Sequence, residues 1–408
     1  RDSTYKSGEF RLRVGNFPGA TTAFPLAVER GKSTPVGFAG PDAVGAKPVT
    51  VSVADPLASA VTVAPKRVGG VSGWPVAVRV SDCPEAIEQE PNDTPATANK
   101  LPVPGGVSAK FEGKQDVDHF AFPGKKGQKL VVAALTTEVN SPAEVYVRVL
   151  DSSGKELAKS DPTKPGTRVE FTPAADGDYV AACEHVNYLT GPTEVYHLSV
   201  RPAAPDFAVT LGSDRADVPA GAVGVVSVTG VSRLNGFTAP VELSVVGADG
   251  IAGTLTIPPG ANPTTAAPLF LPVTAKAGTK PGAYPVRVKA AAKDLVRPAE
   301  FPDALRASFG NLPNPPPEFA GSVLVGVLPA PPFTLTAKLD PAEVTKAGAA
   351  VKGTVTATRT DGFADEIVLS AVAPANVTAK FKPIAKGATS AEFELTATTA
   401  AAAGPGVL

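Results

Sequence analysis

Residues 145–154 read Val-Tyr-Val-Arg-Val-Leu-Asp-Ser-Ser-Gly, a run in which valines alternate with other residues before a turn. Side chains alternate across a strand, so the valines would share one face, and Tyr146 and Arg148 the other. Gly154 can adopt the positive φ that a tight hairpin turn needs. Similar alternation recurs at residues 10–14 and 284–288, whereas helical periodicity is scarce. The stretch therefore predicts an all-β chain of tandem antiparallel sandwiches.

The composition fits packed strands rather than a disordered chain. The 408 residues include 43 Pro and 39 Gly, yet 43% of the chain is hydrophobic. Short apolar runs separated by Pro and Gly are typical of strands joined by turns. The length is enough for roughly three domains of about 100–150 residues.

Charge and hydropathy exclude several classes of partner. The 38 basic and 39 acidic residues leave a formal net charge of -1, so no basic excess predicts nucleic acid or anionic lipid as a partner. No stretch approaches the roughly 20 apolar residues of a membrane helix, and we expect no membrane insertion. Methionine is absent even at position 1, so we expect an internal fragment of a longer protein, in which a missing export signal carries no information.

An internal repeat relates two later parts of the chain. Residues 233–237 read Arg-Leu-Asn-Gly-Phe, and residues 359–363 read Arg-Thr-Asp-Gly-Phe, an offset of 126 positions. At the same offset, Asp214 and Val218 correspond to Asp340 and Val344. We predict two copies of one module, each with a tight turn at its Asn/Asp-Gly pair and the phenylalanine in the core beside it.

Two acidic clusters about two dozen residues apart form the candidate site. The first contains Glu88, Glu90, Asn92 and Asp93, and the second contains Asp116 and Asp118. Calcium takes six to eight oxygen ligands from carboxylates, amides and backbone carbonyls. Alternate residues of an extended segment point the same way, so the ligands of the first cluster can converge on one ion. These six residues predict a calcium site, and the alternative is a solvated acidic linker.

The same residues carry a family resemblance. Residues 85–201 resemble the bacterial pre-peptidase C-terminal domain, a secreted, jelly-roll-like β-sandwich often attached to extracellular peptidases. The resemblance rests on Glu-x-Glu-Pro-Asn-Asp-Thr at 88–94, on Asp-Val-Asp-His-Phe at 116–120 and on Gly-Asp-Tyr at 177–179. In its calcium-binding members, notably the collagen-binding modules of clostridial collagenases, the acidic linker and the later aspartates bind calcium, which implies the same six ligands here. Collagen binding is not implied, because the tyrosines of this chain show no recognisable pattern.

The wider arrangement resembles large exported proteins of planctomycete-type bacteria, in which such modules alternate with small immunoglobulin-like ones. Proline clusters at 201–205, 314–317 and 328–332 are typical of stiff linkers between modules. We therefore expect a tail strand of a preceding module at 1–15, a small immunoglobulin-like module at 16–84, the pre-peptidase C-terminal-like sandwich at 85–201, immunoglobulin-like repeat 1 at 205–329, and a truncated repeat 2 at 332–408 that lacks its closing strands.

Smaller features have competing interpretations. His119, beside the aspartates, suggests zinc, but no second histidine or cysteine stands at a zinc spacing, so we expect a strand histidine that faces solvent. Trp74, the one tryptophan, suggests sugar stacking, but we favour a core or inter-domain plug. Cys83 and Cys183 form either a disulfide or two buried apolar positions, and connectivity cannot be settled here.

The sequence thus predicts a non-catalytic protein of the cell exterior, surface or periplasm: a calcium-stabilised array for adhesion, anchoring or spacing. The expected partners are an extracellular protein or polysaccharide, and other domains of the same longer chain. The alternative is the accessory, substrate-targeting region of a secreted peptidase or other hydrolase, whose catalytic domain lies outside these residues. A carbohydrate-binding module ranks last, because only 6% of the residues are aromatic.

Overall fold

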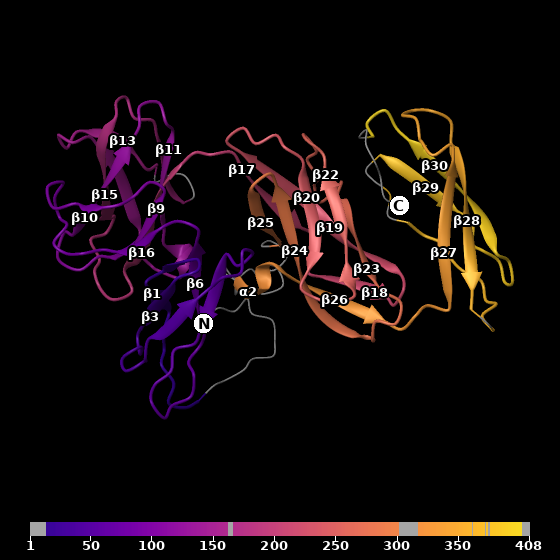
Figure 1. Cartoon of the computed structure of the whole chain (residues 1–408), viewed down its shortest axis with the longest axis horizontal. Coiled ribbons are helices and arrows are strands. Elements are labelled where there is room, and N and C mark those ends of the chain that lie inside the picture. Colours follow the sequence, from indigo (N-terminus) through magenta and orange to yellow (C-terminus); the bar gives the residue numbers. More distant parts are fainter. Residues whose placement is uncertain are drawn as a thin grey trace, which may run out of the picture. The chain divides into compact units, whose positions relative to one another are not determined.

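The computed structural model describes residues 14–161, 166–301, 317–360, 362–371, 373 and 376–401. Nearly all of its regular structure is β-strand, and the strands pair into stacked sheets, so the predicted tandem β-sandwich class is confirmed (Figure 1). The chain divides into two compact units, Arg1–Ala203 and Ala204–Leu408. The tail strand expected at 1–15 lies outside the described residues except for its last two. In the described part of the chain, no helix is long and apolar enough to cross a bilayer.

The first unit begins with a small module of two three-stranded sheets. The sheets have the orders β1-β3-β4 and β2-β6-β5. Valines on their inner faces form the core, with Val36 and Val78 fully buried. The strands are β1 Thr22–Phe24, β2 Ala27–Glu29, β3 Ser33–Ala39, β4 Val49–Ser52, β5 Ala60–Val63 and β6 Val76–Ser81.

The second part of this unit is a sandwich of two five-stranded sheets. One sheet has the order β13-β12-β15-β10-β8, and the other has the order β14-β11-β16-β9-β7. Their shared core is rich in aromatic residues, including the fully buried Phe111, Phe120 and Tyr196. The elements are β7 Glu85–Ile87, β8 Asn99–Lys100, β9 Gly105–Lys110, β10 Val117–Gly124, β11 Leu130–Leu135, η1 Thr137–Val139, β12 Val145–Leu150, β13 Glu156–Lys159, β14 Thr167–Phe171, β15 Gly177–His185 and β16 Val195–Pro202.

The hairpin predicted from residues 145–154 is confirmed. The three valines of β12 are buried, and β12 pairs antiparallel with β13. Asp151 caps the turn, since its Oδ1 accepts hydrogen bonds from the backbone N–H groups of Ser153 and Lys155 at 2.9 and 3.0 Å. Gly154 has φ +85°, as the turn requires.

The chain enters and leaves the sandwich on two strands of one sheet, β7 and β16, which lie on either side of β9. β7 pairs parallel with β9, which places Glu85 opposite Gly106. β16 pairs antiparallel with β9, which places Val200 opposite Gly105. Because Gly105 and Gly106 are neighbours at the start of β9, the first and last strands of the sandwich meet at the same end of this sheet.

The small module packs directly on the sandwich. Leu26 is fully buried against Val139 and Val195 of the sandwich. The backbone N–H of Leu26 donates to Ser108 Oγ at 2.9 Å, and Thr22 Oγ1 donates to the Val139 carbonyl at 3.0 Å. Apolar burial and hydrogen bonds together join the two parts.

The second unit holds the two repeats. In repeat 1 the strands follow the order β18-β26-β24-β25-β17-β19-β23-β21, with β20 paired to β24 and β22 paired to β20, and repeat 2 has the order β27-β28-β30-β29. The elements of repeat 1 are β17 Asp206–Leu211, β18 Arg215–Pro219, β19 Val223–Leu234, β20 Val241–Val246, β21 Ile251–Ala252, β22 Thr254–Ile257, β23 Leu269–Ala275, β24 Gly282–Ala292, β25 Leu295–Glu300, the four-residue α2 Pro317–Ala320 and β26 Ser322–Leu328. Those of repeat 2 are β27 Phe333–Asp340, β28 Val351–Arg359, β29 Val377–Phe381 and β30 Ser390–Ala397.

The structure gives both repeats the same arrangement of arginine and phenylalanine. The Arg233 guanidinium lies 5.5 Å from the centre of the Phe237 ring and donates to the Ala239 carbonyl. Arg359 lies 5.4 Å from the centre of the Phe363 ring and donates to the Asp365 carbonyl. Each partner residue stands at the 126-residue offset. The predicted turn is present at Asn235 and Gly236, and Phe237 is buried beside it. In the second copy Phe363 is partly buried, and Asp361 of the predicted turn lies outside the described residues.

Three smaller expectations have definite outcomes. His119 is buried rather than facing solvent, and its Nδ1 lies 3.2 Å from the backbone carbonyl of Asn92 in the acidic linker. Trp74 is 68% exposed, so the expected plug is wrong. Cys83 and Cys183 are both free and buried, which excludes the disulfide and confirms the interpretation as apolar positions.

Candidate metal centre

The acidic linker crosses between the two sheets of the sandwich. It leaves β7, an edge strand of one sheet, and reaches β8, an edge strand of the other. The N–H of Glu88 donates to the Ser108 carbonyl of β9 at 3.1 Å. The Gln89 N–H donates to Asn99 Oδ1 at 2.6 Å, and Asn99 Nδ2 donates back to the Gln89 carbonyl at 2.8 Å. The linker is therefore attached to both sheets where they come together.

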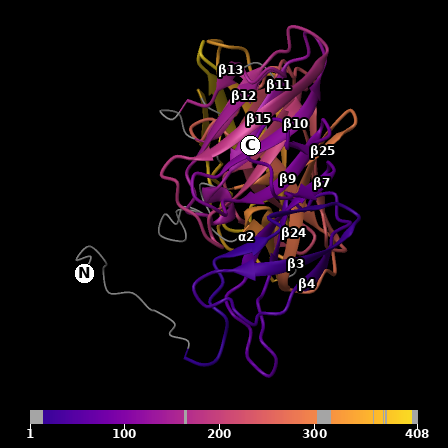
Figure 2. The ribbon, with the colours of Figure 1, turned by 90° about the vertical axis from the view of Figure 1, so that its left-hand side faces the viewer.

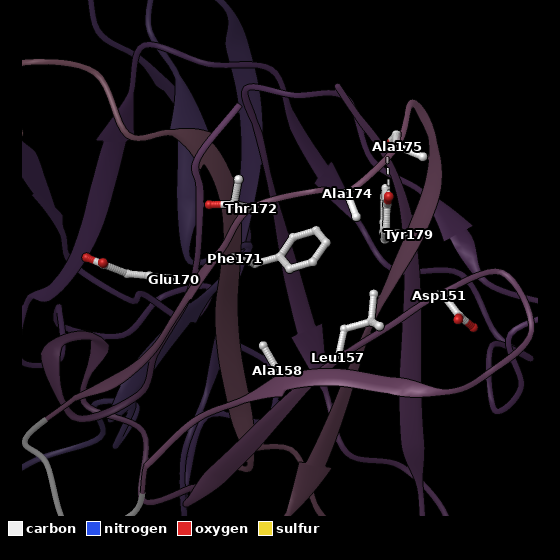
Figure 3. A pocket seen from close by; sticks show the side chains of 9 residues that line it. All are labelled: Asp151, Leu157, Ala158, Glu170, Phe171, Thr172, Ala174, Ala175 and Tyr179. Atoms are coloured by element: carbon white, nitrogen blue, oxygen red, sulfur yellow. Dashed lines mark hydrogen bonds between the residues drawn. The ribbon is translucent and has the colours of Figure 1, made fainter. Parts of the chain in front are cut away.

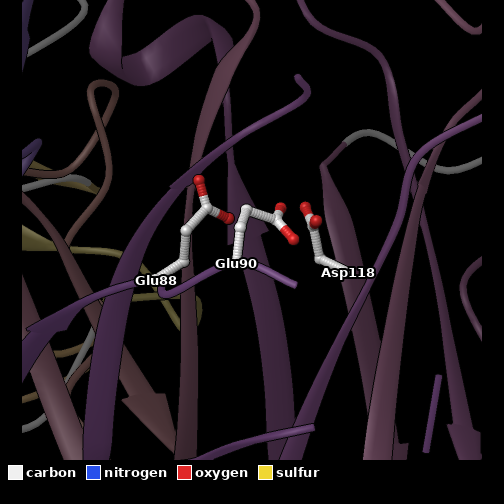
Figure 4. A group of neighbouring side chains, drawn as sticks. All are labelled: Glu88, Glu90 and Asp118. Carbon is white, nitrogen blue, oxygen red and sulfur yellow. The ribbon is translucent and has the colours of Figure 1, made fainter. Parts of the chain in front are cut away.

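Three carboxylates converge beside this linker. Glu88, Glu90 and Asp118 each offer one oxygen, and these oxygens lie within 4.8 Å of one another. Figure 4 shows the three groups turned toward a common space. Two oxygens on opposite sides of a calcium ion are about 4.8 Å apart, because each sits about 2.4 Å from the metal. Glu88 and Asp118 are buried and Glu90 is exposed, so the group is closed on one side and open to solvent on the other.

Each buried carboxylate has one oxygen held and one oxygen unused. Glu88 Oε1 accepts the Lys110 N–H at 2.6 Å, and Asp118 Oδ2 accepts the hydroxyl of Tyr196. Glu88 Oε2 and Asp118 Oδ1 are buried and have no hydrogen-bond partner among the described residues. Buried polar atoms nearly always have partners, because leaving one unpaired costs about 1–3 kcal/mol. A cation between these oxygens would satisfy both, so the residues present fit a calcium ion.

Asn92 also has buried polar atoms that lack hydrogen-bond partners. Its side chain is fully buried, and neither amide atom has a hydrogen-bond partner within the described parts of the chain. Its backbone carbonyl accepts the His119 N–H at 3.0 Å, which fixes the linker to β10. The amide oxygen is thus available as a further neutral ligand.

The other two predicted ligands lie outside the three-carboxylate group. Asp116 is buried, and its Oδ2 accepts the Glu112 N–H at 2.6 Å. Asp93 is exposed. Burial and then the charge of Asp93 raise the pKa of Asp116, so these two carboxylates are close enough to interact. The structure therefore brings Glu88, Glu90 and Asp118 together, and Asp116 lies beside this group, where its side chain interacts with those of both Asp93 and Asp118.

Burial makes the charge of this site costly. Loss of hydration, followed by the charges of Glu90 and Asp116, raises the pKa of Glu88 to about 8. Loss of hydration, followed by the charge of Glu88, raises the pKa of Asp118 to about 9. Burial also raises the pKa of Glu90. Without a cation, the carboxylates resist ionisation because burial removes their hydration, and the charge of Lys110, which lowers the pKa values of Glu88 and Glu90, has a smaller influence on either group than burial.

Tyr196 is the functional residue that the sequence analysis missed. It lies on β16, in the sheet opposite Asp118, and is fully buried. A tyrosine at an inward strand position needs a partner for its hydroxyl, and this requirement was the available signal. The identity of the partner depends on how the two sheets stack, which residue spacing does not reveal.

The described histidines and Cys183 are already engaged or inert. His119 Nδ1 lies 2.9 Å from the Val117 carbonyl, His185 Nε2 lies 3.2 Å from Glu194 Oε2, and His197 Nε2 lies 2.8 Å from Glu85 Oε2. Burial raises the pKa of the Cys183 thiol well above its usual value, the opposite of what a nucleophile needs.

A separate hollow of about 440 Å³ lies between β13, β14 and the turn before β15 (Figure 3). Phe171 and Tyr179 line its base, and the Tyr179 hydroxyl donates to the Ala175 carbonyl at 2.8 Å. Its two carboxylates are engaged, since Asp151 caps the hairpin and Glu170 pairs with Lys129 and Arg168. The hollow therefore offers no group comparable to the unused oxygens of the acidic site.

Comparison with known proteins finds distant structural likenesses alone. No known protein family matches the chain, and neither does any curated protein. Among solved structures, the pre-peptidase C-terminal domain of a Bacillus anthracis collagenase is 16% identical, with 28% of this chain and 99% of that chain covered and a TM-score of 0.22. The chicken CNTN1 FN1-FN3 domains are 11% identical over 68% and 90%, with a TM-score of 0.21. Eight N-terminal Ig domains of Down Syndrome Cell Adhesion Molecule are 6% identical over 94% and 53%, with a TM-score of 0.18.

These likenesses are too distant to carry an argument about function. They include both kinds of sandwich expected from the sequence, a pre-peptidase C-terminal domain and immunoglobulin- or fibronectin-like domains. Nothing in them supports the resemblance to exported proteins of planctomycete-type bacteria.

Proposed function

We propose that this chain is a non-catalytic array of β-sandwich modules from the cell exterior, stabilised by calcium bound at Glu88, Glu90 and Asp118. Asn92 adds a neutral oxygen, and Asp93 and Asp116 reinforce the negative field from the adjacent pair. Two observations carry the proposal: Glu88, Glu90 and Asp118 each offer an oxygen within 4.8 Å of the others, and Glu88 Oε2 and Asp118 Oδ1 are buried with no hydrogen-bond partner among the described residues. Of the cations proteins commonly bind, calcium best matches an all-oxygen set that is partly open to water.

Bound calcium would stabilise the folded state rather than take part in a chemical reaction. In the metal-free state, the buried carboxylates repel one another and lack water, as their raised pKa values indicate. A bound cation removes both penalties and stabilises the folded state by about 2.7 kcal/mol when its concentration is 100 times Kd. Glu88 belongs to the linker and Asp118 to β10, so the ion would connect the incoming chain to the sandwich.

The non-catalytic role rests on the state of the reactive groups. In the described parts of the chain, His119, His185 and His197 each lie within hydrogen-bonding distance of a carbonyl or carboxylate oxygen, and the Cys183 thiol is fully buried. A nucleophile needs an activating base and access to substrate. An adhesion, anchoring or spacer role requires neither.

The test is calcium titration of the full chain by calorimetry, together with thermal melting in calcium and in chelator. We expect a heat of binding with one strong site and a higher melting temperature in calcium. Asp118→Asn should abolish both effects, whereas Asp151→Asn, the matched change in the hairpin cap, should leave both intact. The proposal is excluded if calcium gives no heat of binding and the melting temperatures in calcium and in chelator are equal. It is also excluded if Asp118→Asn and Asp151→Asn weaken calcium binding equally.

A further inference from the structure

The loops at one end of the small module expose an unusual set of apolar side chains. We call Val14, Val44, Val68, Val71 and Trp74 the valine–tryptophan tip. Their exposed fractions are 88%, 87%, 76%, 55% and 68%, respectively. They come from three segments, residues 14–19, 40–48 and 64–75, which leave the strands at the lower end of the module in Figure 1. Scattered exposed valines are ordinary, but a group with the one tryptophan marks an interaction site.

The tip is held in place by a single arginine. Arg67 donates from Nε to the Val44 carbonyl at 2.9 Å and from Nη1 to Asn16 Oδ1 at 3.0 Å. Its Nη2 donates to the Asp42 carbonyl at 2.8 Å and pairs with the Asp42 carboxylate. All three loops are therefore connected through Arg67, and the exposed side chains are presented on a prearranged surface.

The charged side chains at the two ends of the module differ in their pairing. At the end where β3 begins, Arg30 pairs with Asp82, and Lys32 pairs with Glu29. At the tip, where β3 ends, Asp42 is already paired with Arg67. Lys47 and Lys66 are exposed there, adjacent through a backbone hydrogen bond of 2.9 Å, and neither has an ion-pair partner among the described residues. The near-neutral average of the whole chain thus conceals a basic, apolar tip.

We propose that the valine–tryptophan tip docks on a lipid bilayer with anionic phosphate headgroups. Trp74 and the valines would enter the boundary between headgroups and acyl chains, and Lys47 and Lys66 would contact the phosphates. Docking of this kind needs no membrane-spanning segment.

Three observations favour a bilayer over other occupants. Protein interfaces are depleted in lysine, whereas tryptophan and lysine together are typical of membrane interfaces. Side chains that are 55–88% exposed project outward, so a protein partner would need a matching hollow, while a bilayer would not. A polysaccharide needs hydrogen-bonding side chains around its aromatic platform, but Asn16, Asp42 and Arg67 are already used within the tip.

The full chain provides its own probe, because Trp74 is its one tryptophan. We would titrate it with phosphatidylcholine vesicles with and without phosphatidylglycerol, in chelator throughout, so that the outcome is independent of the proposed calcium site. We expect a blue shift of tryptophan emission and protection from acrylamide with phosphatidylglycerol, both reduced by added salt.

Matched variants separate the tip from general surface effects. Lys47→Gln with Lys66→Gln should lower the partition coefficient about tenfold or more, because each surface lysine contributes about fivefold. Lys125→Gln with Lys126→Gln, in the turn between β10 and β11, removes the same charge and should have no such effect. Val44→Ser with Val68→Ser should weaken binding, whereas Val186→Ser with Leu189→Ser, exposed loop residues of the sandwich, should not.

The proposal is overturned if emission is unchanged with every vesicle, or if the control variants weaken binding as much as the tip variants. It is also overturned if the blue shift appears on concentrating the chain without lipid, because the occupant would then be a second copy. Circular dichroism of each variant confirms that the exposed substitutions leave the fold intact.

Discussion

The hydroxyl of Tyr196 donates a hydrogen bond to Oδ2 of Asp118, and the two residues project from opposite sheets of one sandwich. Both side chains are fully buried, so the bond crosses the core. It holds one oxygen of the carboxylate, while the other, Oδ1, has no hydrogen-bond partner among the described residues, and the carboxylate lies beside those of Glu88 and Glu90. A hydrogen bond within the core thus positions the Asp118 carboxylate, a ligand that the linker does not supply.

Replacing Tyr196 with phenylalanine should weaken calcium binding. The change keeps the ring but leaves Asp118 without its partner, so we expect about tenfold lower affinity and about 1–2 kcal/mol lower stability. Calorimetry and denaturant unfolding measure the two effects. Tyr179→Phe is the control, since its hydroxyl bonds to the Ala175 carbonyl away from the acidic site. Unchanged affinity in the Tyr196 variant would show that Asp118 is not positioned through this bond.

The metal-free chain should lose stability as pH rises. Glu88 and Asp118 keep protons up to pH values of about 8 and 9 in the folded state, whereas unfolded carboxyls titrate near 4. Between these limits the folded state binds more protons, so its free energy of unfolding falls with pH, by up to about 1.4 kcal/mol per pH unit for each group.

Melting temperatures in chelator should therefore decrease from roughly pH 5 to 9, and calcium should cancel most of the decrease because it binds the deprotonated carboxylates. Calorimetry in buffers of different ionisation enthalpy should show proton release on binding. A flat melting profile in chelator would contradict the buried, unpaired state of these groups.

Replacing Glu88 with glutamine should have opposite effects with and without calcium. In chelator at about pH 8 the variant should be more stable than the native chain by about 1–3 kcal/mol, because a buried charge has been removed. Calcium should add little to the stability of the variant, because one ligand of the ion has been lost. Glu156→Gln, on an exposed strand, should change neither value. A Glu88 variant that is destabilised equally in both conditions would indicate a structural role alone.

The arginine of each repeat should stabilise its own module. Arg233→Lys and Arg359→Lys keep the charge but lose the planar group that donates to backbone carbonyls and covers the phenylalanine ring. We expect about 1–3 kcal/mol lower local stability. Hydrogen exchange followed by mass spectrometry should show faster exchange confined to the repeat that carries the change. Arg215→Lys, at an exposed position, serves as the control.

Leu26 should couple the small module to the sandwich. Leu26→Ala removes a fully buried side chain from its contact with Val139 and Val195, at a cost of about 2–4 kcal/mol. Exchange should accelerate on both sides of the contact, in residues 22–29 and in residues 137–139. Val51→Ala, within the core of the small module, should affect that module alone. Acceleration limited to the small module in both variants would show that the contact does not couple them.

Local patterns predicted most of the fold. Alternating valines, the Asp-Ser-Ser-Gly turn and the 126-residue repeat all involve residues near one another in sequence or a simple offset, and each is present in the structure. Glu88 and Glu90 followed from their spacing on one segment. Asp118 followed from its residue type, although spacing could not separate it from Asp116, since that distinction depends on strand register and burial.

The remaining features depend on contacts between distant residues. Tyr196 lies 78 positions from Asp118 and reaches it only because two sheets stack. His119 is buried and contacts Asn92 of the acidic linker, which alternation within its own strand cannot show. Trp74 is apolar but exposed because it lies in a loop whose geometry is set by Arg67, so hydrophobicity alone predicted the wrong environment.

The backbone enters and leaves the sandwich opposite neighbouring residues of β9, so the sandwich adds little to the end-to-end length of the chain. Duplicating or deleting such a unit shifts its neighbours along the chain by about two strand spacings, roughly 10 Å, because β7 and β16 lie on either side of β9. Duplication or deletion of such units in the gene therefore changes the number of sandwiches in the polypeptide with little effect on its end-to-end length.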